Sequence, residues 1–319
     1  MDTARRVFSG ARTGQKIVAN IYRPRMRPHT DGARRVTLLL THANGFHKEL
    51  WEPTLQRLFA HRSGRWTIEE AIALDGYNHG DSAVANRASI AGETYTPWFL
   101  AARDILAVLS QLGGGRGKRA VVGIGHSWGA SSLLLAEIIS PLSFAGIIAT
   151  DPVLHTKPTG HAEVAAITLK RRTEWASESA AREYFVGHPF FGAWDPRIRD
   201  LYIAHGLEAS GPGAATRILK CRPENEAAVY RGALYASPFA ANNLWRIQCP
   251  TAFLTGETSH LAPPQHIADI IGDITDCTHM VMPGAGHLLL HENPDGTADC
   301  YAKLLDGFAP KLLLPAANL

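Results

Sequence analysis

Apolar residues along this chain follow two alternating patterns. Short, nearly continuous apolar runs are separated by longer segments in which apolar residues recur every three to four positions. The runs predict buried strands and the longer segments predict amphipathic helices, an alternation typical of a mostly parallel α/β sheet with helices on both faces. The predicted strands are residues 16–22, 36–41, 67–74, 120–124, 145–150, 251–255 and 279–282. The predicted helices are residues 53–60, 96–112, 130–139, 264–271 and 294–305.

The segment from residue 153 to residue 243 breaks this pattern. It contains no clear strand but many aromatic residues, among them Trp175, Phe185 and Phe191. An aromatic, helical insertion between two sheet strands predicts a lid over a pocket, although aromatic residues at helical spacing equally suit an ordinary core. We therefore expect a core built from residues 1–152 and 244–319, and a helical lid at residues 153–243.

The composition fits one large α/β domain with an insertion, or two small domains, because 45% of the 319 residues are hydrophobic. The net charge of +3 is spread along the chain, and the basic cluster at residues 23–27 is broken by a proline, which favours a surface loop over a nucleic-acid site. No apolar stretch approaches the ~18 residues of a membrane span, and the N-terminus lacks the apolar core of a signal peptide. We expect a soluble protein that binds neither nucleic acid nor membranes.

The pentapeptide GHSWG at residues 125–129 lies between a predicted strand and a predicted helix. The pattern G-x-S-x-G in that context is the nucleophile elbow, in which Ser127 occupies a strained turn. Small residues on both sides of the serine let the strand and the helix approach closely. Ser127 is therefore the candidate nucleophile, and the competing interpretation is a glycine-rich turn with an incidental serine.

Four motifs follow one another along the chain, each at the end of a predicted strand. They are HANGF at residues 42–46, DGYNHGDS at residues 75–82, the serine turn, and PGAGH at residues 283–287. This series resembles the α/β-hydrolase family over nearly the whole chain. The resemblance implies a mostly parallel, eight-stranded sheet flanked by helices, with a helical lid, and a nucleophile, acid and histidine in that order. More narrowly, THANGFHKELW at residues 41–51 resembles trans-acting, thioesterase-like fungal hydrolases of toxin and polyketide biosynthesis.

A serine hydroxyl needs a base to accept its proton. Of the fifteen histidines, His287 fits the late position that the family resemblance implies, after a strand and a small, flexible turn. His291 is the alternative four residues later. His126 lies beside Ser127, and we expect it to pack against the turn.

The acid that orients this base has two candidates. In the family it commonly follows the strand after the lid in a G-x-x-D pattern, but here Ser259 occupies the position of the aspartate. Glu257 is near that position, two residues too early. The resemblance also allows an earlier acid, and related hydrolases with an HANGF loop tend to carry an acid–proline pair there, which Asp151 matches. We favour Asp151 over Glu257, although Asp151 could instead cap the first turn of the lid.

The tetrahedral intermediate of acyl transfer needs preorganised backbone donors for its oxyanion. The family pattern assigns one donor to the N–H of Trp128, and aligning the histidine of the HANGF loop with the family's H-G motif assigns the other to Asn44. Phe46 would then face the acyl pocket. We interpret Asp75 and His79 as structural, because a metal site formed by them with His42 has no recognised ligand spacing.

These assignments predict a serine hydrolase that forms an acyl-enzyme on an ester, thioester or lactone, without cofactor or metal. The narrower resemblance implies a polyketide-type thioester, delivered by coenzyme A or an acyl-carrier protein and transferred to water or to an internal hydroxyl to give a macrolactone. Epoxide hydrolases and haloalkane dehalogenases are disfavoured because both use a carboxylate where this chain has Ser127. The alternative is a non-catalytic ligand-binding or non-hydrolytic member of the fold.

Two features bear on localisation. The four cysteines form no C-x-x-C pair, which suits a reducing, intracellular compartment, and we expect a cytoplasmic protein. The last three residues, Ala317, Asn318 and Leu319, resemble a degenerate form of the S-K-L peroxisomal signal. A peroxisomal location is therefore a second possibility, set against an ordinary frayed tail.

Overall fold

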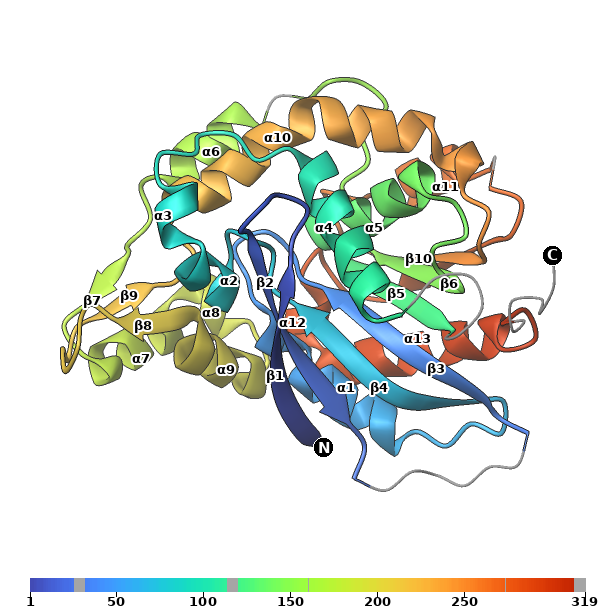
Figure 1. Ribbon diagram of the computed structural model, residues 1–319, viewed down its shortest axis with the longest axis horizontal. Helices are drawn as coiled ribbons and strands as arrows, with labels where there is room; N and C mark the ends of the chain where they lie inside the picture. Colours follow the sequence, from blue (N-terminus) through green and yellow to red (C-terminus); the bar gives the residue numbers. More distant parts are fainter. Residues whose placement is uncertain (26–31, 114–119, 160, 273, 313–319) are drawn as a thin grey trace.

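The main sheet has eight strands in the order β1-β2-β4-β3-β5-β6-β10-β11. The computed structural model describes residues 1–25, 32–113, 120–159, 161–272 and 274–312. Strand β2 pairs antiparallel with β1 and with β4, and the other neighbours are parallel. This sheet confirms the predicted α/β-hydrolase fold (Figure 1). The strands are β1 (Asp2–Ser9), β2 (Lys16–Arg23), β3 (Arg34–Thr41), β4 (Trp66–Leu74), β5 (Val121–His126), β6 (Gly146–Thr150), β10 (Thr251–Gly256) and β11 (Cys277–Met282).

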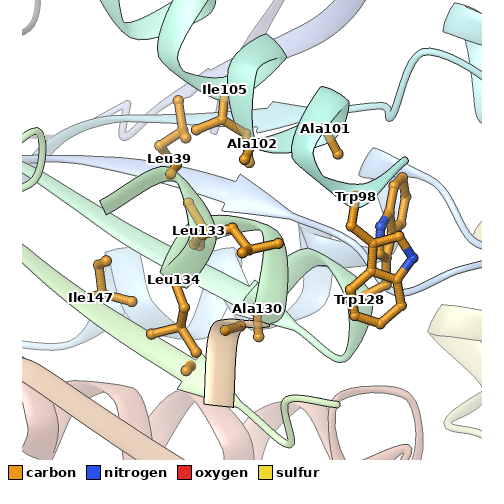
Figure 2. Close-up of a cluster of buried hydrophobic side chains, with 14 of the residues drawn as sticks. Leu39, Trp98, Ala101, Ala102, Ile105, Trp128, Ala130, Leu133, Leu134 and Ile147 are labelled. Carbon is orange, nitrogen blue, oxygen red and sulfur yellow. The ribbon is translucent and has the colours of Figure 1, made fainter. Parts of the chain in front are cut away.

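Helices cover both faces of the sheet, as the apolar runs predicted. Along β3, Leu39 belongs to the apolar core on one face, whereas Leu38 and Leu40 belong to the core on the other. Central strands covered on both faces are apolar at successive positions, which explains the nearly continuous runs in the sequence. One core includes α4 (Trp98–Gln111) and α5 (Trp128–Ile139), whose side chains meet Leu39 and Ile147 of the sheet (Figure 2). The other includes α1 (Glu52–Ala60) and α13 (Pro294–Phe308).

Shorter helices occupy several of the connections. They are η1 (Lys48–Trp51), α2 (Gly80–Ala85), α3 (Arg87–Ile90), η2 (Leu244–Arg246), α11 (Pro264–Ile270) and α12 (Leu289–Glu292). Among the described residues, no helix has both the length and the apolar character required to cross a membrane.

Strand β1 was not located by the hydrophobic pattern. Seven of its eight residues are exposed, and only Phe8 is buried. An edge strand with one buried position gives neither an apolar run nor an alternation. Its place is set by the ladder it forms with β2.

The insertion between β6 and β10 is helical, but the expectation that it holds no strand is wrong. Three short strands form a second sheet in the order β7-β9-β8. Strands of two or three residues are too short to show alternation in the sequence. Most of these elements gather at the left of the view in Figure 1, and α10 runs above them toward α11. The lid elements are α6 (Ala162–Thr168), β7 (Glu174–Trp175), α7 (Glu178–Gly187), α8 (Pro189–Gly192), α9 (Pro196–Gly206), β8 (Leu207–Ala209), β9 (Arg217–Leu219) and α10 (Pro223–Asn242).

The turn between β5 and α5 depends on two glycines that have no room for a side chain. A Cβ on Gly125 would lie 2.6 Å from backbone atoms of Ala130, and one on Gly129 would lie 2.5 Å from the carbonyl oxygens of Thr41 and His42. The first turn of α5 therefore packs directly on the end of β3. Because the loop after β3 begins there, this contact fixes Ser127 relative to that loop.

We predict that Gly129→Ala lowers the free energy of unfolding by about 3 kcal/mol, because the new methyl group must displace backbone oxygens. Gly307→Ala is the matched control, since Gly307 is exposed in α13 with no atom within 4 Å of its Cβ position. That change should leave stability equal or raise it by up to about 1 kcal/mol. Urea unfolding measures both, and equal effects of the two substitutions would contradict the packing argument.

Candidate active site

Ser127 lies on the turn between β5 and α5 with φ 54° and ψ −120°. This left-handed φ is unusual for a residue with a side chain and is typical of strained turns at functional sites. The turn is held by the backbone N–H of Ser127, which donates to the carbonyl oxygen of Thr150 at 2.9 Å. The residue is buried, yet it lines a cavity.

The structure brings the predicted nucleophile, base and acid into one chain of hydrogen bonds. His287 Nε2 lies 3.0 Å from Ser127 Oγ, and Nδ1 of the same ring lies 2.5 Å from Asp151 Oδ2. A carboxylate can only accept, so Nδ1 carries the proton and Nε2 is free to accept one from the serine. Ser127 follows β5 and Asp151 follows β6, so both lie at the carboxyl edge of the parallel strands, where α/β folds place ligands.

The Asp151 carboxylate is completely buried and accepts two further hydrogen bonds. The backbone N–H of Gly256 donates to Oδ1 at 2.9 Å, and Ser259 Oγ donates to Oδ2 at 2.5 Å. Ser259 thus occupies the position where the family more often has aspartate, and it contributes a hydroxyl donor to the earlier acid. Its position was noted in the sequence, but its contact with Asp151 was not predicted.

The alternative acid, the alternative histidine and His126 take other positions. Glu257 is exposed, and its carboxylate accepts from the backbone N–H of Gly284 at 2.7 Å. His291 is buried against Phe46 and Trp194, with ring centroids 4.3 Å and 5.0 Å away. His126 Nε2 donates to the carbonyl oxygen of His287 at 2.8 Å, so His126 holds the backbone of the proposed base.

The two predicted oxyanion donors line the same cavity as Ser127. Trp128 is the first residue of α5, where helical N–H groups have no partner within the helix. Asn44 is held in the facing loop by its side-chain amide, which donates to the carbonyl oxygen of Glu226 at 3.0 Å. Phe46 lies on the cavity wall, as predicted, and packs edge-on against Trp194.

A buried ammonium group supports the loop that carries Asn44. Lys48 is fully buried, and its Nζ lies 2.8 Å from carboxylate oxygens of Glu49, Asp75 and Asp81. Burial opposes the charge of Lys48, but these three carboxylates outweigh it and raise the lysine pKa. Although its own desolvation acts in the opposite direction, attraction to Lys48 and Lys220 lowers the pKa of Asp81 to about 2.

His42 and His79 use their ring nitrogens within the same loops. The backbone N–H of Gly76 donates to His42 Nε2 at 3.0 Å, and that of Gly45 donates to His79 Nε2 at 2.9 Å. Burial lowers the pKa of both rings, which keeps them neutral acceptors. Among the residues that the structure describes, no group of three or more His, Cys, Asp or Glu side chains is arranged to hold a metal ion.

The cavity over Ser127 has a volume of about 610 Å³ and is roofed by the lid. Its wall is mostly apolar and aromatic, with Trp98 from α4 and with Val229, Phe185 and Phe191 from the lid. One ion pair interrupts this surface, between Arg171 and Glu226. Neither residue could be predicted from the sequence, because they are 55 positions apart and no local pattern links them.

Comparisons with known proteins bear on this arrangement. The sequence profile of the alpha/beta hydrolase family matches residues 38–300. Peroxisomal membrane protein LPX1 of Saccharomyces cerevisiae is 28% identical over 285 residues, which cover 82% of this chain and 73% of that protein. Type I acyl-CoA thioesterase mpaH' of Penicillium brevicompactum is 25% identical over 209 residues, covering 63% of this chain and 47% of that protein. Both relatives are fungal and one is named a thioesterase, in agreement with the predicted resemblance to thioesterase-like fungal hydrolases.

A solved structure shows the same fold. The peroxisomal α/β-hydrolase Lpx1 of Saccharomyces cerevisiae superposes with a TM-score of 0.82 at 24% identity, over 100% of this chain and 91% of that one.

We predict that stability falls on acidification because of the buried imidazole of His126. Burial and the neighbouring His287 lower its pKa to about 3, against about 6.5 in the unfolded chain. The unfolded state therefore binds the extra proton first, and stability is lost as pH falls below about 6.5. From pH 7 to pH 5 this group alone should cost about 2 kcal/mol.

Urea unfolding of the wild type and of His126→Gln at both pH values measures this contribution. Glutamine keeps a donor for the His287 carbonyl but does not titrate. The pH-dependent loss should shrink by about 2 kcal/mol in the variant. An unchanged loss would show that His126 is not the responsible group.

Proposed function

The chain belongs to the alpha/beta hydrolase family, and from that premise we propose that it is a serine hydrolase that forms an acyl-enzyme on Ser127. The names of its relatives support a hydrolase of the esterase or thioesterase kind. The observation that carries the proposal is the continuous chain of hydrogen bonds from Ser127 Oγ through His287 to Asp151, at the wall of a cavity.

The geometry supports a specific division of labour. Ser127 Oγ attacks the acyl carbonyl while His287 Nε2 accepts the hydroxyl proton, which it later returns to the leaving thiol or alcohol. Asp151 holds the ring orientation and stabilises the imidazolium that forms. Gly256 N–H and Ser259 Oγ also donate to Asp151, so both carboxylate oxygens have a donor from the protein.

The oxyanion of the tetrahedral intermediate is assigned to the backbone N–H groups of Trp128 and Asn44. Removing one such donor typically costs about 10²–10³ in kcat. Trp128 is fixed by the backbone contact of α5 with β3, and Asn44 by the hydrogen bond from its side-chain amide to the Glu226 carbonyl. The donors therefore need little reorganisation during the reaction.

The substrate proposed here is a polyketide-type acyl thioester, carried by coenzyme A or an acyl-carrier protein. The apolar, aromatic cavity suits an acyl chain. A relative named as an acyl-CoA thioesterase supports a thioester as the acyl donor. The acceptor is water or a hydroxyl of the substrate itself, which would give a lactone.

We predict that a fluorophosphonate probe labels the wild type rapidly and that Ser127→Ala abolishes the labelling. Ser179→Ala, an exposed lid serine, is the control and should label like the wild type. Intact-protein mass spectrometry with acyl N-acetylcysteamine thioesters should show an acyl adduct on the wild type. An inert Ser127 in a protein that binds acyl ligands tightly would instead support the non-catalytic member of the fold.

The acid assignment predicts a ranking of two variants. Asp151→Asn should lower kcat by about 10²-fold or more, because the imidazole loses its charged partner. Glu257→Gln should be mild, because that exposed carboxylate contacts a backbone N–H rather than His287. Ester hydrolysis measures both variants, with circular dichroism as the folding control. If Glu257→Gln lowered kcat more than Asp151→Asn, the acid would be Glu257 instead of Asp151.

We also propose that the chain is peroxisomal, as the name of its yeast relative says of that protein. The predicted signal at residues 317–319 lies outside the described residues. A fluorescent protein fused to the N-terminus should give punctate signal, and deletion of the last three residues should make it diffuse. Diffuse signal from both proteins would remove the proposal and leave the cytoplasmic expectation.

A further inference from the structure

The ion pair in the cavity wall joins two segments of the lid. Arg171 follows α6, and its Nη1 donates to Oε2 of Glu226 in the first turn of α10. Arg171 Nη2 also donates to the hydroxyl of Tyr202 at 3.0 Å. The Arg171 and Glu226 side chains are 25% and 10% exposed, and both line the cavity that holds Ser127.

A partly buried ion pair contributes little to stability, because desolvating the two charges offsets most of their attraction. Burial raises the pKa of Glu226 even though Arg171 opposes that shift, which shows how poorly this site solvates a carboxylate. In ligand pockets, a few polar groups on an apolar wall usually fix the orientation of the ligand. We therefore look for the role of this ion pair in ligand binding and not in stability.

Both side chains line the cavity and keep unused hydrogen-bonding capacity. A guanidinium group has five N–H donors, of which this one uses those facing Glu226 and Tyr202. Within the described part of the chain, Oε1 of Glu226 accepts no hydrogen bond. This oxygen is also not fully buried. A ligand group beside the ion pair would therefore find an acceptor, Glu226 Oε1, next to the N–H donors of Arg171.

The pair also lies beside the loop assigned to the oxyanion. A Cβ on Gly45 would be 2.8 Å from the carboxyl carbon of Glu226, and Asn44 donates to the Glu226 backbone. Gly45 directly follows Asn44, so the carboxylate lies close to the carbonyl end of a bound acyl chain. The polar position is therefore near the reacting bond rather than at the far end of the cavity.

We propose that Arg171 and Glu226 form a subsite for a hydroxyl group carried by the acyl chain close to its carbonyl. A hydroxyl donates to Glu226 and accepts from Arg171, matching both groups at once. Beside this pair, a carboxylate would be attracted by Arg171 but repelled by Glu226, and an ammonium group would be attracted by Glu226 but repelled by Arg171. This inference rests on the proposed function for its substrate, an acyl thioester, and names the class as hydroxyacyl.

The test compares β-hydroxyoctanoyl and octanoyl N-acetylcysteamine thioesters, which differ by one hydroxyl. The wild type should favour the hydroxyacyl thioester by about 10-fold or more in kcat/KM, since pairing that hydroxyl satisfies groups that octanoate leaves unpaired. Glu226→Gln and Arg171→Met should each reduce this ratio about tenfold. A general loss of activity in a variant lowers kcat/KM for both thioesters and leaves their ratio unchanged.

Arg182→Met is the matched control, because Arg182 pairs with Asp200 on the exposed surface of the lid. That variant should keep the wild-type ratio. A wild-type ratio near one, or equal losses for both thioesters in Glu226→Gln, would overturn the proposal.

Binding of the same two thioesters to Ser127→Ala, measured by calorimetry, tests the subsite without turnover. A preference for the hydroxyacyl compound supports the subsite even if Ser127 proves inert and the proposed function fails. Equal affinities overturn the subsite even if the wild type hydrolyses both thioesters.

Discussion

The contact between the first turn of α5 and the end of β3 is the constraint on which the site depends. Gly129 has no side chain, and the carbonyl oxygens of Thr41 and His42 lie where its Cβ would be. This contact sets the spacing between the N–H of Trp128 and the loop that presents Asn44. The other end of that loop is held by the buried ammonium group of Lys48. The candidate oxyanion donors are thus fixed by packing on one side and by charge on the other.

The second organising feature is the position of the negative charge. Asp151 extends from the end of β6, where it accepts from the N–H of Gly256 at the end of β10 and from the hydroxyl of Ser259 in the turn that follows. Both are neutral donors aimed at a carboxylate that is fully buried. In a low-dielectric site, such donors stabilise the ionised acid without adding a second charge. Ser259 therefore supports Asp151 as the acid by donating a hydrogen bond to its carboxylate.

Much of the fold and of the candidate site could be predicted because the signals are local. Ser127 is flanked by glycines, His287 ends a small-residue turn, and Asp151 ends an apolar run, so each is visible in a few residues. Strand β1 was missed because it buries only Phe8, and the lid strands because they span two or three residues. Arg171 and Glu226 were missed for a different reason. Their significance arises from a contact across the lid, which no local pattern records.

The lid also affects the order in which the molecule can fold. Strands β6 and β10 are neighbours in the sheet, yet the whole lid separates them along the chain. Closing such a long segment costs chain entropy before any ladder bond forms, and contacts of this kind are slow to form. Asp151 meets Ser259 and His287 only across this junction, 108 and 136 residues away. During synthesis the turn that carries Ser127 is therefore made long before His287. The hydrogen-bonded chain of Ser127, His287 and Asp151 forms only when β10 and β11 join the sheet.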